Sequence, residues 1–75
     1  MNNSRRKRIN KSILALEEVK NNLEEVLLEE QNALNGFPDN GEHNEMREGI
    51  KNIISGLEDT LSSLEDALNT INDSF

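Results

Sequence analysis

The chain has 75 residues and a net charge of −7, and a chain this small makes one domain that buries only about 60% of its unfolded surface. It has no cysteine, which excludes disulfides and thiolate metal sites. The longest apolar run, Val26-Leu27-Leu28, is far shorter than the roughly 18 residues of a membrane span, and the N-terminus lacks a signal-peptide core. We therefore expect a cytoplasmic protein with no membrane partner.

The first helix is predicted over residues 4–35, with Asn3 or Ser4 as its N-cap. Its apolar residues recur with heptad spacing, and Val19, Val26 and Ala33 widen this stripe to the width typical of a bundle core. Lys20 interrupts the stripe, and its stem can lie along the apolar surface with the ammonium in water. The apolar seam of this helix consists of Ile9, Ile13, Leu16, Leu23, Leu27 and Leu34.

A turn is predicted over residues 36–42. Gly36 is expected to follow the first helix in the left-handed conformation, and Pro38 forbids continuation of the helix. The second helix is predicted over 43–74, and its seam repeats a four-then-three apolar spacing without interruption. That seam consists of Ile50, Ile54, Leu57, Leu61, Leu64, Leu68 and Ile71.

Two helices of similar length joined by a short turn indicate an all-α fold, an antiparallel two-helix hairpin. Two helices alone leave half of each stripe in water, so we expect the hairpin to self-associate into a four-helix bundle or a larger helical oligomer. Leu14 and Leu28 lie off the stripe, either in contact with another chain or simply exposed. A larger host protein is the alternative source of the missing apolar surface.

Small and polar residues form two columns along the second helix: Gly49, Gly56, Ser63 and Thr70, then Ser55, Ser62 and Asn69. Together they predict a smooth, nearly uncharged flank, suited either to close approach of another backbone or to solvent. The next flank is a single-sign acidic stripe, formed by Glu58, Asp59, Glu65, Asp66 and Asp73.

The charge of the chain is divided unequally, because a basic arm over residues 1–11 carries +5 and the remainder carries −12. The bases of the arm are Arg5, Arg6, Lys7, Arg8 and Lys11. In an antiparallel hairpin they can neutralise the acidic end of the second helix. Alternatively they form an anion site, where a nucleotide or another anionic signal is captured at the helix start.

The acidic stripe has a second interpretation, in which it imitates nucleic-acid phosphates to block a DNA-binding protein. Binding of duplex nucleic acid itself is disfavoured, because the basic run lacks interleaved aromatics and the acidic body repels phosphates. Catalysis is not expected: His43 is the only histidine and lies in the predicted turn region, and no residue pattern indicates a metal or cofactor site.

The segment Glu29-Glu30-Gln31-Asn32-Ala33-Leu34-Asn35-Gly36-Phe37-Pro38, followed by repeated Leu-Glu-Asp units, resembles a group of small acidic hypothetical proteins of bacteriophages and prophages. The likeness covers residues 9 to 72. It implies an accessory protein in the host cell cytoplasm that binds and inhibits a host protein, such as a component of a defence system. No activity or binding residue carries over from the group.

Overall fold

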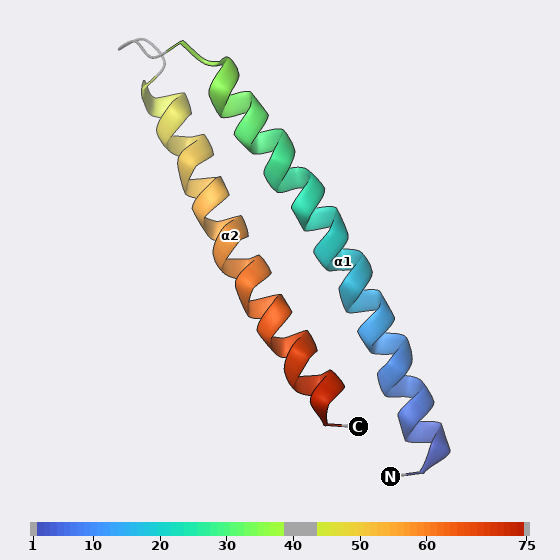
Figure 1. Cartoon of the computed structure of the whole chain (residues 1–75). Helices are drawn as coiled ribbons and strands as arrows, with labels where there is room; N and C mark the ends of the chain where they lie inside the picture. The colour runs from blue at the N-terminus through green and yellow to red at the C-terminus, as the bar shows by residue number, and fades with distance from the viewer. Residues whose placement is uncertain (1, 39–43, 75) are drawn as a thin grey trace.

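The computed structural model describes residues 2–38 and 44–74 and contains two helices, α1 (Asn3–Gly36) and α2 (Asn44–Asp73). The helices run antiparallel side by side, with the two chain ends at the same end of a rod (Figure 1). The rod measures 60 × 15 × 13 Å between Cα atoms. This confirms the predicted all-helical fold with two helices packed against each other. Within the described residues, neither helix is long and apolar enough to cross a membrane.

The N-terminus of α1 is capped by Asn2, one residue before the helix. Its side-chain Oδ1 accepts a hydrogen bond from the backbone N–H of Arg5 at 2.8 Å, and its carbonyl accepts one from the N–H of Arg6 at 3.1 Å. The prediction of Asn3 or Ser4 as the cap was therefore wrong by one or two residues. An extended backbone conformation at Asn2, with ψ of 163°, places the amide oxygen over the unpaired N–H groups of the first turn.

The C-terminus of α1 differs from the expected glycine cap. Gly36 is the last helical residue, and no glycine in the described residues has a positive φ, so the predicted left-handed conformation at this position is wrong. Phe37 ends the helix in an extended conformation and donates its N–H to the carbonyl of Leu34 at 3.2 Å. The rest of the predicted turn, 39–42, and the predicted start of the second helix at residue 43 lie outside the described residues.

The two helices meet along the predicted seams. Among the described residues, Ile13 and Leu68 are the buried side chains, with 8% and 5% of their surface exposed. The other predicted seam residues are half-buried except Leu16, which is exposed. Lys20 and Glu30 continue the same spacing on α1 and are also half-buried, so the α1 seam contains two charged positions whereas Ile50 to Ile71 on α2 contain none.

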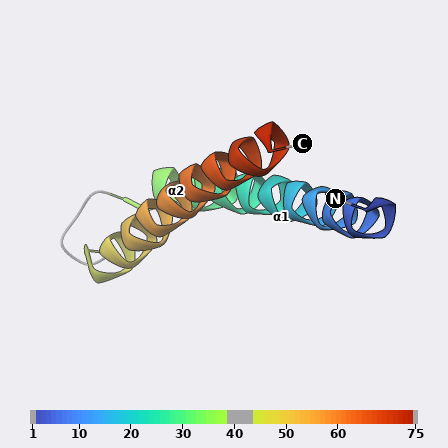
Figure 2. The same ribbon diagram turned by 90° about the horizontal axis from the view of Figure 1, so that it is seen from below.

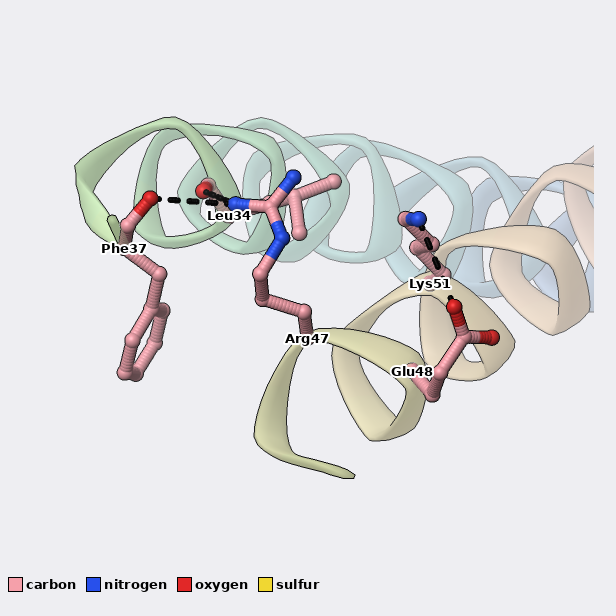
Figure 3. A network of polar contacts seen from close by, with 5 residues as sticks. All are labelled: Leu34, Phe37, Arg47, Glu48 and Lys51. Carbon is pink, nitrogen blue, oxygen red and sulfur yellow. Dashed lines mark hydrogen bonds and ion pairs between the residues drawn. The ribbon is translucent and has the colours of Figure 1, made fainter. Parts of the chain in front are cut away.

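A polar contact joins α2 to the end of α1 (Figure 3). The guanidinium Nη1 of Arg47 donates hydrogen bonds to the carbonyl of Phe37 at 3.0 Å and to the carbonyl of Leu34 at 3.3 Å. The last carbonyls of a helix have no partner inside the helix, and α1 has no basic residue in its own last turn. Arg47 occupies the seam position one step before Ile50, so α2 supplies the basic side chain that the last turn of α1 lacks.

Candidate functional site

The flanks of the seam make the two broad faces of the hairpin chemically different. In an antiparallel pair, the residues immediately before the seam residues of both helices lie on one side of the rod. The residues immediately after the seam residues lie on the other side. Figure 2 shows that the helix axes are inclined to each other.

One side, which we call the uncharged face, carries a single ionisable residue between its two ends among the described residues, Glu29 at its outer edge in the column of Ala15 and Asn22. It holds four of the exposed large apolar side chains, of which Ile53 is 51% exposed. The rest, apart from Glu29, are small or polar and uncharged. Besides Glu29, the uncharged face consists of Ser12, Ala15, Val19, Asn22, Val26 and Ala33 on α1, and Met46, Gly49, Ile53, Gly56, Thr60, Ser63, Ala67 and Thr70 on α2.

A groove opens in the uncharged face near the chain ends, with a volume of about 760 Å³. Seam residues form its floor, and Ser12 and Ala67 leave it open because their side chains are small. Arg5 and Arg8 stand at its end. The groove is lined by Arg5, Arg8, Ile9, Ser12, Ile13, Leu16, Ala67 and Ile71.

The opposite side, which we call the charged face, is polar. Its smaller groove, of about 260 Å³, brings Glu17 and Lys20 of α1 together with Glu65 of α2 and a set of asparagines. Leu14 and Leu28 lie at the outer edge of this face, 67% and 59% exposed, and are isolated from each other by two heptads. The apolar residues of this face therefore form no continuous patch.

The acidic stripe is exposed, but its position relative to the small-residue columns corrects the sequence prediction. Successive residues of a helix point about 100° apart, so the columns that begin at Ser55 and Gly56 are not adjacent on the surface. Asp59, Asp66 and Asp73 lie between them. Only the glycine column therefore belongs to the uncharged face, and the predicted smooth flank that combined both columns is wrong.

The bases of the N-terminal arm surround the first turns of α1 and do not form one cluster. Arg5 and Arg8 point to the groove, whereas Lys7 and Lys11 occupy other sides of the helix. The described ion pairs lie within single helices, from Lys20 Nζ to Glu24 at 3.8 Å and from Lys51 Nζ to Glu48 at 3.4 Å. The predicted neutralisation of the arm by the acidic end of α2 is not seen as ion pairs for Arg5, Arg8 or Lys11 with any described acid.

The glycines of α2 on the uncharged face have no contact that requires them within the hairpin. A Cβ atom built on Gly49 or Gly56 has no heavy atom within 4 Å beyond the local helix. Close approach of another backbone is one physical reason for glycine at these positions. The other helix of the hairpin does not make that approach, so these sites are free to receive a different chain.

The described residues hold no cluster of three or more His, Asp or Glu side chains that could bind a metal. The residue that sequence analysis missed is Arg47, whose position on the seam spacing and just after the turn was the available signal. His43 lies outside the described residues. No protein-family model, curated protein or solved structure matches this chain.

Proposed function

We propose that this protein acts by binding other proteins, without catalysis, and that its uncharged face joins it to copies of itself in a helical oligomer. The observation that carries the proposal is the contrast between the faces: Val19, Val26 and Ile53 are exposed together where no charge separates them. A monomer would leave these side chains and the adjoining groove in water, which costs about 25 cal/mol per Å² of apolar surface.

Oligomer formation through the uncharged face leaves the charged face and the outer edge of α2 in solvent, where the acidic stripe meets a second protein. The sequence resemblance to phage proteins supports a host protein as that partner, which this chain would bind and inhibit. An exposed stripe of one sign attracts a basic surface and raises the rate of encounter with it. The acidic stripe is thus the proposed recognition element for the host protein, and imitation of nucleic-acid phosphates is one form that this recognition takes.

The assembly is tested by sedimentation equilibrium at micromolar concentration. The wild-type chain is expected to exceed its monomer mass of 8.5 kDa. Ile53→Lys is expected to lower the mass to that of a monomer, because it places a charge in the apolar contact. Leu28→Lys is the matched control, since Leu28 is as exposed as Ile53 but lies on the charged face. A wild-type chain that sediments as a helical monomer contradicts the proposal.

A second candidate function is capture of a nucleotide or other anionic signal, favoured by the position of Arg5 and Arg8 beside the groove. A groove of about 760 Å³ is within the range of small-molecule sites. Calorimetric titration with a cyclic nucleotide tests it. Binding that disappears in the Arg5→Ala, Arg8→Ala double variant but persists in Lys7→Ala, Lys11→Ala supports capture, and absence of binding to the wild type rejects it for that ligand.

A further inference from the structure

We propose that the groove beside Arg5 and Arg8 is filled by a second copy of this chain, packed antiparallel against the uncharged face so that each groove receives Val26 and Ile53 of the other copy. This inference rests on the proposed self-association and specifies its geometry. In this arrangement, the bend of one hairpin lies at the chain ends of the other.

Along the uncharged face, small side chains lie near the chain ends and large apolar side chains lie nearer the bend. At the chain-end half of the face, Ser12 of α1 and Ala67 of α2 line the same groove and leave it open. Toward the bend, Val26 lies one heptad from Val19, and Ile53 lies one heptad from Thr60. Both side chains are exposed. A two-fold axis through the level of Val19 and Thr60 therefore places Val26 opposite Ser12 and Ile53 opposite Ala67, while Val19 meets Val19 of the other copy.

The alternative stacking, in which both hairpins point the same way, gives poorer packing. Val26 would then lie over Ile53 of the second copy, and Ser12 would lie over Ala67, so large side chains would meet at one end and a void would remain at the other. Antiparallel stacking gives each groove its two apolar side chains, which is the interdigitation that well-packed helical interfaces show.

Charge at the edges of the face supports the same arrangement. Arg8 and Glu29 stand on the same edge of α1 at nearly equal distances from Val19, on either side of it. The two-fold axis therefore brings Arg8 of each copy next to Glu29 of the other, so the pair occurs twice. Hairpins pointing the same way would instead place both basic arms at one end of the assembly.

The available area is sufficient for such a dimer. The outline of the rod, 60 × 15 Å, gives each broad face about 900 Å². Stable interfaces bury about 800 Å² on each partner. Along α2, Gly56 would lie near Ser63 of the second copy and Gly49 near Thr70, so the small-residue column permits the backbones to approach.

A charge exchange tests the predicted edge contact. Arg8→Glu is expected to weaken association about 10-fold at low salt, because two symmetric exposed pairs are lost and like charges replace them. Adding Glu29→Arg to the same chain should restore the wild-type dissociation constant, as measured by sedimentation. A double variant that associates as weakly as Arg8→Glu alone would overturn the proposed contact between these residues.

Disulfide trapping tests the orientation directly, because the natural chain has no cysteine. Val19→Cys lies on the proposed two-fold axis, and mild oxidation should link most chains into covalent dimers, since bridged Cα atoms must lie within about 7 Å. Leu28→Cys, on the charged face, should remain unlinked, and circular dichroism checks that both variants stay helical.

The outcomes separate this inference from the proposed function. If the wild-type chain is oligomeric but Val19→Cys links only when mixed with Thr60→Cys, the hairpins stack in the same direction and the antiparallel inference is overturned while self-association stands. If the wild-type chain is monomeric at micromolar concentration, self-association and the inference both fail. Efficient linkage of Val19→Cys to itself supports the antiparallel pair.

Discussion

Different interactions stabilise the packing of the two helices at the two ends of the rod. Toward the chain ends, Ile13 of α1 and Leu68 of α2 are the most deeply buried apolar side chains of the described residues. At the bend, Arg47 donates hydrogen bonds to the carbonyls of Leu34 and Phe37, and the neighbouring seam residues are only half-buried. Apolar burial is non-directional and tolerates sliding, whereas two hydrogen bonds to particular carbonyls fix the register. The hairpin thus obtains its register from the bend and much of its apolar contact from the far end.

The largest effect is expected at the chain ends. Leu68→Asp would put an unpaired carboxylate at a position that is 5% exposed, and we expect it to destabilise the fold by about 4 kcal/mol. Thermal denaturation followed by circular dichroism measures the loss. Leu14→Asp, on an exposed position of α1, is the control and should change stability by less than about 0.5 kcal/mol. Equal melting temperatures for the two variants would contradict the burial of Leu68.

A smaller and more local effect is expected at the bend. Arg47→Met keeps the apolar stem but loses both hydrogen bonds to the end of α1, which should cost about 1 to 3 kcal/mol. Amide hydrogen exchange should increase in the last turn of α1 and remain near wild type around Ile13. Lys51→Met removes a neighbouring charge that pairs only with Glu48 in its own helix, and serves as the control. Uniform acceleration along α1 would mean that the contact is not a local cap.

Between the ends, Gly56→Ala tests whether the uncharged face is free in the isolated hairpin. The added methyl has open space around it, and alanine favours a helix over glycine by about 1 kcal/mol, so the variant should melt higher under conditions where the chain is monomeric. Gly49→Ala, closer to the bend, should behave alike. A lower melting temperature for either variant under these conditions would contradict the open space around the two glycines.

The smallest effect is expected for the pair between Lys20 and Glu24. Both residues lie on one helix, the charged atoms are 3.8 Å apart and Glu24 is largely exposed, so Glu24→Gln should cost about 0.3 kcal/mol. The difference should vanish in 1 M NaCl, where the Debye length is about 3 Å. Melting curves at low and high salt check this. A cost that persists in high salt would mean that Glu24 acts through more than its charge.

Apolar periodicity was sufficient to predict two packed helices, because the spacing of Ile50 to Ile71 places every apolar side chain on one stripe. Cap geometry was less predictable. Gly36 is able to adopt a left-handed conformation but is the last helical residue here, and Arg47 instead bonds the carbonyls of Leu34 and Phe37. The side chain that bonds the carbonyl of Leu34 lies 13 residues away in sequence, so the residues around Gly36 alone do not reveal this contact.

The candidate surface was predictable only in part. Val19, Val26 and Ala33 were recognised as a widening of the α1 stripe, but pairing them with Met46 and Ile53 requires the antiparallel arrangement of both helices. The same geometry separates Ser55 from the glycine column, which sequence order had joined. The groove likewise depends on small residues from both helices, Ser12 and Ala67, which a reading along one helix does not bring together.

The Arg47 contact also has a kinetic consequence. It closes a loop of 13 residues, whereas Ile13 and Leu68 close one of 55, and the longer loop costs about 1.3 kcal/mol more in chain entropy if formed first. Folding should therefore nucleate at the bend and zip toward the termini, each turn shortening the loop that the next must close. The side chains that line the groove are then the last to be ordered. A newly made chain would therefore align its own two helices before its groove can bind another chain.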